Sequence, residues 1–205
     1  MADKFSLLPQ LKTAAVARNL LAPEAELDAE TAFRLVRDMP YLRASDSRSE
    51  TLIREWRGTC SGKHYLLKDL YAELGIPSHV IACTHVAYFD PGSTAPELRR
   101  LLEETGGRFV DVHNYLVLEL PEGEMNVDAT WPLATAKYGF TVNEICELGT
   151  DQRIACQPIE CWPVPEDRDP QEFKRQLLEE HFTPAELEHR DRVIRTLGKF
   201  LGAAT

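Results

Sequence analysis

Hydrophobic residues recur at helical spacing near the N-terminus, which predicts two amphipathic helices there. The first covers residues 5–21, and the second covers 29–39 with Asp28 as its N-cap. The polar segment 43–50 predicts a loop that runs into one or two helical turns over 49–56. These helices precede the segment in which the candidate chemistry begins.

A stronger helical pattern starts at Cys60 and ends near Gly75. Its apolar face is broad and comprises Tyr65, Leu66, Leu67, Leu70, Tyr71 and Leu74. Glycine favours the conformation that ends a helix, and Pro77 cannot continue one. The pattern therefore predicts a helix buried in the middle of a domain.

The segments after this helix are rich in β-branched and aromatic residues, which are typical of strands. Strands are predicted over 79–89, 108–120 and 125–131, with one or two more within 138–162, the clearest at 153–162. The connections are predicted to be a turn at 91–93, a helix within 94–107 and a hairpin-like turn at 121–124. Two further helices follow in 169–201, the second opened by a capping box from Thr183 to Glu186.

Helices, then mostly antiparallel strands, then helices define an α+β fold. A chain of 205 residues is long enough for one full core, so we expect a single domain over 1–205. Its core is predicted at about 45–165, with a helical extension over 1–44 and a helical tail over 166–205.

Composition excludes several classes of protein. The formal net charge is −10 and no basic stripe occurs, which argues against nucleic-acid binding. No apolar run approaches the roughly 20 residues of a membrane helix, and the N-terminus does not resemble a secretory signal. Five cysteines, an odd number, favour free thiols in a reducing compartment, so we expect a soluble cytoplasmic protein. The oligomeric state is left open.

Cys60 is the candidate nucleophile, because it stands where a glycine-containing loop gives way to a helix. Unpaired N–H groups and the positive end of the helix dipole lower the pKa of a thiol at that position. Such a thiol needs a base and a group that orients the base. His113 lies on a predicted strand, with Asp111 on the same strand face, and Asp128 follows on the next strand.

Three blocks of the chain resemble the transglutaminase-like superfamily of papain-fold cysteine enzymes. RGTCSGKHYLLKDLYAELGIPSHVIAC resembles its cysteine block, HNYLVLEL its histidine strand, and NVDATWP its aspartate block. Together these blocks cover roughly residues 55–135. The resemblance implies a papain-like core in which a central cysteine-bearing helix packs on an antiparallel sheet.

The resemblance also assigns roles: Cys60 as nucleophile, His113 as general base and acid, and Asp128 as the orienting group. It implies an acyl-transfer enzyme that acts on a peptide, amide or thioester through a thioester intermediate, without a metal or organic cofactor. Hydrolysis is the favoured outcome, and transfer to an amine is the alternative. Arylamine N-acetyltransferases share the triad and rank lower, because RGTC has one residue fewer than their motif. A non-enzymatic binding scaffold is the alternative of another class.

Rival roles stay open for several residues. His64 competes with His113 as the base, since it lies one helical turn after Cys60, and Asp111 competes with Asp128. A zinc set is the metal alternative and would comprise Cys60, His64, Cys83 and His85. The other four cysteines, Cys83, Cys146, Cys156 and Cys161, are interpreted as buried small hydrophobes. Two tryptophans either wall a cleft or pack in the core: Trp56 and Trp131. An oxyanion hole would use the Cys60 N–H and a second donor, for which the candidates are Trp56, Arg57 and Ser61.

Overall fold

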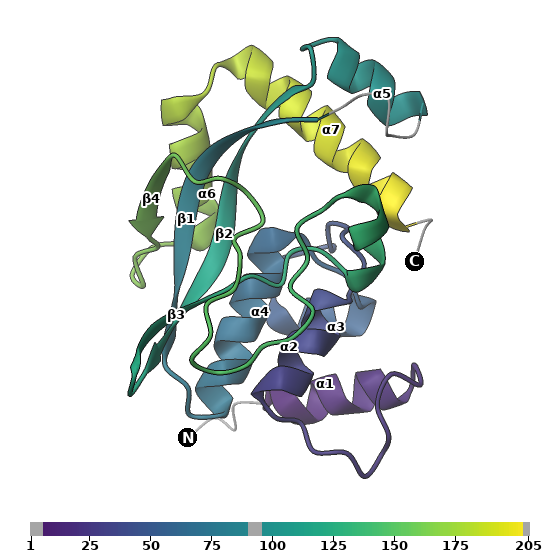
Figure 1. The fold of residues 1–205 in the computed structure, drawn as a ribbon, viewed down its shortest axis with the longest axis vertical. Helices are drawn as coiled ribbons and strands as arrows, with labels where there is room; N and C mark the ends of the chain where they lie inside the picture. The colour runs from purple at the N-terminus through teal and green to yellow at the C-terminus, as the bar shows by residue number, and fades with distance from the viewer. Residues whose placement is uncertain (1–5, 90–95, 203–205) are drawn as a thin grey trace.

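The computed structural model describes residues 6–89 and 96–202 (Figure 1). The helices are α1 (Leu7–Val16), α2 (Ala29–Arg37), α3 (Ser49–Glu55), α4 (Cys60–Glu73), α5 (Pro96–Glu103), the 3₁₀ helix η2 (Leu133–Tyr138), α6 (Pro170–His181) and α7 (Pro184–Gly202). The strands are β1 (Ser78–Tyr88), β2 (Arg108–Leu120), β3 (Gly123–Val127) and β4 (Glu160–Pro163). The predicted α+β class is confirmed.

The four strands form one antiparallel sheet in the order β3-β2-β1-β4. β1 pairs with β2 along its whole length, from Ser78 opposite Leu118 to Tyr88 opposite Arg108. This pairing places Cys83 opposite His113 on one side of β1, and Cys161 of β4 opposite Cys83 on the other.

The long predicted strands match β1 and β2 closely, whereas the weaker patterns gave looser results. The third strand ends at Val127, so Asp128 lies just beyond β3 rather than within it. Most of the predicted strand at 153–162 is irregular, and β4 covers only Glu160–Pro163. The helix η2 was not predicted, and the turn expected at 91–93 lies outside the described residues.

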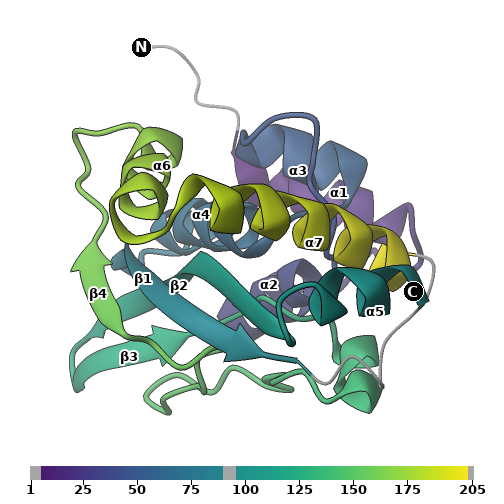
Figure 2. The same cartoon turned by 90° about the horizontal axis from the view of Figure 1, so that it is seen from above.

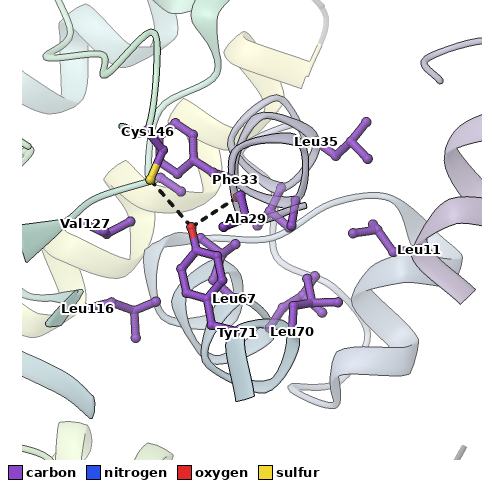
Figure 3. Packing of buried hydrophobic residues seen from close by; sticks show 14 of the residues in the cluster. Leu11, Ala29, Phe33, Leu35, Leu67, Leu70, Tyr71, Leu116, Val127 and Cys146 are labelled. Atoms are coloured by element: carbon purple, nitrogen blue, oxygen red, sulfur yellow. Dashed lines mark hydrogen bonds between the residues drawn. The ribbon is translucent and has the colours of Figure 1, made fainter. Parts of the chain in front are cut away.

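The main core forms where α4 packs against the sheet and against α2. Tyr71 of α4 is fully buried there, and its hydroxyl lies 3.7 Å from the Cys146 sulfur and 3.5 Å from the Ala29 carbonyl oxygen (Figure 3). Leucines on the same face of α4 pack against Phe33 of α2. The buried face predicted for the helix after Cys60 is therefore the centre of the core.

The two C-terminal helices pack onto the sheet together with α4 (Figure 2). Phe173 and Leu177 of α6 pack with Ala82 and Val112 of the sheet. The predicted capping box begins α7: the Thr183 N–H donates to Oε2 of Glu186 over 2.8 Å. Among residues 6–89 and 96–202, no helix combines the length and apolar character needed to cross a bilayer.

Candidate active site

Helix α4 begins abruptly at Cys60, which leaves its first N–H groups directed away from the helix. Trp56 adopts a left-handed conformation with φ 53°, Thr59 is extended, and the first helical bond runs from the Lys63 N–H to the Thr59 carbonyl, 3.0 Å. The N–H groups of residues 60–62 therefore have no acceptor within the helix. They give the helix start the partial positive charge that favours an anion.

Gly62 permits the close packing that fixes this helix start. A Cβ on Gly62 would lie 2.8 Å from Cδ2 of Leu52, which belongs to α3. Leu52 is itself almost fully buried. Gly62, the second glycine of the RGTCSG sequence, thus lets α3 approach the first turn of α4 and hold Cys60 in place.

The strand β2 brings His113 to the same place, and the segment after β3 brings Asp128. Nε2 of His113 lies 2.8 Å from Oδ2 of Asp128, and both side chains are buried. Continuing the β2–β3 register would set Asp128 opposite Tyr115, two residues along β2 from His113. The side chains of His113 and Asp128 therefore bridge this two-residue offset between the strands.

Asp128 is itself held firmly. Its carboxylate accepts hydrogen bonds from the N–H of Thr130, 3.0 Å, and from the N–H of Ala155, 2.7 Å. Its own N–H donates to the side chain of Gln152 over 2.8 Å. Burial would raise the pKa of Asp128, but the charge and hydrogen bond of His113 outweigh burial and lower it well below the usual range. The carboxylate is thus ionised and fixed.

The groups around Cys60 and His113 favour the thiolate form of the cysteine and the imidazolium form of the histidine. Burial raises the pKa of the Cys60 thiol, but the charge of Lys174, followed by the hydrogen bond and charge of His113, lowers it to about 6. Burial also opposes the imidazolium form of His113, yet Asp128 and Cys60 raise its pKa well above the ordinary value. Because Nε2 contacts Asp128, Nδ1 is the ring nitrogen left for the thiol.

His64, the rival base, has both ring nitrogens engaged by backbone. Nδ1 donates to the Cys60 carbonyl oxygen over 2.7 Å, and Nε2 accepts from the Ala129 N–H over 2.9 Å. Burial lowers the pKa of His64 to about 4, even though Asp128 raises it. A neutral imidazole of fixed tautomer ties the start of α4 to the segment after Asp128.

Asp111, the rival orienting group, points to the C-terminal helix α7 instead. Its Oδ1 accepts from Nε of Arg190 over 2.6 Å and from the Val112 N–H over 2.7 Å. Burial would raise the pKa of Asp111, but Arg190 and Lys174 lower it below the usual range. The His113 ring is therefore bonded to Asp128, and Asp111 serves a separate buried ion pair.

The zinc alternative lacks the required arrangement. Both ring nitrogens of His64 are occupied, and within the described ranges no three His, Cys, Asp or Glu side chains converge as a metal site would need. The sulfur of Cys83 lies 3.8 Å from that of Cys156 instead.

The tail contributes residues that the sequence did not point to. Lys174 of α6 places Nζ 3.8 Å from the Cys60 sulfur and 3.0 Å from Oγ of Ser61. Ser61 in turn donates to Oδ1 of Asn114 over 2.7 Å. The sequence gives one indication that Lys174 faces the protein: it lies beside Phe173 and within one helical turn of Leu177, the buried residues of its helix.

A cleft of about 570 Å³ opens above the thiol. One wall is the segment 41–47, the floor is the start of α4, and the other walls are α6 and α7. Tyr41 is buried beside the thiol, where burial and the charges of Cys60 and Asp111 raise its pKa well above the ordinary value. Cys60, only 3% exposed, is reached through this cleft.

The remaining candidates have structural surroundings. Trp56 belongs to the main core. The ring of Trp131 lies 4.4 Å from that of Tyr41 and packs against a separate buried cluster that α5 and α7 help to form. Arg57 is paired with Glu55 at 2.6 Å. Of the three candidates for a second oxyanion donor, only Ser61 lines the cleft.

All five cysteines are free. Cys83 and Cys146 are buried as expected, but Cys156 is partly exposed and Cys161 is exposed, so the expectation of burial is wrong for these two.

Comparisons of this chain with protein-family models, with curated proteins and with solved structures find no match in any of the three.

Proposed function

We propose that this protein is a cysteine-dependent acyl-transfer enzyme of the transglutaminase-like type, with a papain-like core. It hydrolyses an amide or peptide bond through Cys60, His113 and Asp128, and it works in the cytoplasm, where the thiol stays reduced. One observation carries the proposal: a buried histidine bonded to a buried carboxylate at 2.8 Å interacts with a cysteine that stands at a helix start and lines an open cleft.

The charges of the site support attack by a thiolate. A pKa of about 6 leaves Cys60 largely ionised at neutral pH. Asp128, held by two N–H groups, keeps the protonated His113 ring in one orientation. Reactive thiolate and proton donor are therefore both present before the substrate binds.

The acylation half-reaction needs one attack and one proton transfer. The Cys60 sulfur attacks the carbonyl carbon of the substrate, and the carbonyl π electrons move onto oxygen. When this intermediate collapses, the C=O bond forms again and the C–N bond breaks. His113 gives its Nδ1 proton to the departing amine. The products are a free amine and a thioester on Cys60.

Deacylation reverses the role of the histidine. Neutral His113 takes a proton from water as the water oxygen attacks the thioester carbon. Collapse expels the Cys60 thiolate, releases a carboxylic acid and restores the imidazolium. An amine in place of water gives a new amide, so hydrolase and transferase share every step up to the acceptor.

The proposal is tested by intact-mass and product analysis. Wild type, C60A and H113Q are incubated with a proteome-derived peptide library, with and without a primary alkylamine. We expect new peptide termini from wild type alone, and amine-capped products in proportion to the amine if acceptors other than water are used. Equal cleavage by C60A, or no covalent Cys60 adduct with any acyl compound, would contradict the enzyme and favour the binding scaffold.

A further inference from the structure

Lys174 reaches the reacting sulfur from a helix more than a hundred residues further along the chain. Its ammonium group lies 3.8 Å from the Cys60 sulfur and 3.0 Å from Oγ of Ser61, at the first turn of α4. Its nearest carboxylate oxygen, on Asp111, is 3.9 Å away, and that atom already accepts from Arg190 at 2.6 Å. The side chain is 12% exposed, so it borders the cleft rather than the core.

This position matches the place where negative charge develops during acyl transfer. In a tetrahedral intermediate the oxyanion lies roughly 2.7 Å from the attacking sulfur, within reach of donors near 3 Å. The free N–H groups at residues 60–62 and the Lys174 ammonium both lie at this end of α4. Ser61 fixes the ammonium beside those N–H groups, and Asn114 fixes Ser61.

We propose, on the basis of the proposed function, that Lys174 is the second oxyanion donor and pairs with the Cys60 N–H. Before reaction its cation faces the thiolate. As the sulfur shares its electron pair with the substrate carbon, the negative charge passes to the carbonyl oxygen, and the ammonium follows it by donating a hydrogen bond there. No proton leaves Lys174, and collapse of the intermediate returns the charge.

Tyr41 is the competing donor, because it is also buried against the thiol. Two facts favour Lys174. It carries a full positive charge, which strengthens a hydrogen bond to an oxyanion. It is also bonded to Ser61 at the helix start, where the oxyanion must lie to receive the Cys60 N–H. The titratable and charged groups around the thiol are Tyr41, Lys63, Tyr65, Cys83, Asp111, His113, Cys156, Lys174 and Arg190.

The experiment separates thiolate formation from oxyanion stabilisation. Iodoacetamide alkylates the Cys60 thiolate without forming an oxyanion, whereas S-phenyl thioacetate acylates it through one. Thiophenolate leaves without a proton, so the reaction does not depend on His113 as an acid. Both rates are measured across pH for wild type, K174M, K174R and Y41F, with K68M as control because Lys68 pairs with Glu166 at the surface.

We expect K174M to raise the pH midpoint of alkylation, since it removes a cation beside the thiolate. At about pH 9, where ordinary thiols are largely ionised, its ratio of acylation to alkylation should fall by roughly a hundredfold, as for loss of one oxyanion donor. K174R should restore much of the ratio, while Y41F and K68M should stay near wild type.

Three results would overturn the assignment in different ways. An unchanged ratio in K174M, with wild type readily acylated, refutes the oxyanion role of Lys174 alone; a fall confined to Y41F transfers the role to Tyr41. A wild type that is alkylated at Cys60 but never acylated refutes the proposed function as well. Circular dichroism melts of each variant show whether a loss follows from unfolding.

Discussion

The carbonyl oxygen of Cys60 lies 2.7 Å from Nδ1 of His64, one helical turn further along α4. The histidine nearest to Cys60 in sequence therefore contacts the backbone of Cys60 and not its thiol. With Nε2 accepting from the Ala129 N–H, His64 joins the segments that carry Cys60 and Asp128. His113, which is 53 positions further along the chain than Cys60, is the ring that interacts with the thiol.

His64 is therefore expected to matter for stability rather than for thiol reactivity. H64Q removes two buried hydrogen bonds of good geometry, and we expect it to lower the free energy of unfolding by about 1–3 kcal/mol. The pH midpoint of Cys60 alkylation should move little. Chemical denaturation and iodoacetamide kinetics measure the two effects, and an upward shift of the midpoint as large as that of H113Q would make His64 the base.

The same residue predicts a pH dependence of stability. The pKa of His64 is about 4 in the folded protein, below the roughly 6.5 of an unfolded histidine. The unfolded chain binds the proton more tightly, so stability falls as pH drops from about 6.5 to 4. The wild-type slope should exceed that of H64Q by at most roughly 1.4 kcal/mol per pH unit. Equal slopes in denaturant titrations would show that His64 is protonated without cost.

Alkylation of Cys60 should follow a low titration midpoint. With a pKa of about 6, the iodoacetamide rate should rise to a plateau above about pH 7, whereas an ordinary thiol has its midpoint near 8.5. H113Q should move the midpoint upward because it removes the hydrogen bond and the imidazolium charge. A wild-type midpoint at or above about 8.5 would exclude the thiolate–imidazolium pair. Mass mapping identifies the alkylated cysteine.

Local sequence patterns predicted most of the elements that carry the proposed triad. β1 and β2 were predicted within one residue at each end, because their β-branched and aromatic runs are long. The helix start at Cys60 followed from the glycine-containing loop and the apolar periodicity after it. The pairing of His113 with Asp128 was expected from the resemblance, and its geometry required the side chains to bridge a two-residue offset.

The long-range part of the site had no such pattern. Lys174 and Arg190 lie on amphipathic helices, where charged residues ordinarily face solvent. Their contacts with Cys60 and Asp111 depend on how α6 and α7 pack onto the sheet, which local periodicity does not encode. The segment from Asp128 to β4 is largely irregular, because side chains such as Asn143 and Gln152 hold its backbone in place of strand pairing. Strand propensity therefore predicted more strand there than the structure contains.

Replacing Asp128 and replacing Asp111 should shift the pKa of the Cys60 thiol in opposite directions. D128N removes the charge that stabilises the His113 imidazolium, so the alkylation midpoint of Cys60 should rise and peptide cleavage should fall roughly 10²–10⁴-fold. D111N removes a carboxylate whose charge raises the pKa of Cys60, so the midpoint should fall.

D111N also leaves Arg190 without its 2.6 Å partner, and we expect a lower melting temperature for that reason. The pair of variants thus supplies its own control, because both remove one buried carboxylate. If both midpoints rise, or if D111N alone abolishes cleavage, Asp111 and not Asp128 orients the base. The comparison requires only alkylation rates and one peptide substrate.

Cys83 and Cys156 should form the first intramolecular disulfide under mild oxidation. Their sulfurs are 3.8 Å apart, and a disulfide needs about 2.05 Å, so a small movement of the irregular segment at Cys156 closes the bond. The hydrogen bond from Cys156 lowers the pKa of Cys83 and makes it the better nucleophile. Hydrogen peroxide takes two electrons and two protons from the pair and is reduced to water.

Closing this bond should slow acylation of Cys60, because Cys156 follows Ala155, whose N–H holds Asp128 at 2.7 Å. Wild type is treated with peroxide, and any sulfenic acid on Cys60 is then reduced with arsenite. Its acylation by S-phenyl thioacetate should be slower than before treatment, whereas C156S should keep its rate. Peptide mapping in a C60S background locates the bond without interference from the nucleophile. A link between Cys83 and Cys161, which face each other across β1 and β4, would contradict the geometry argued for Cys156.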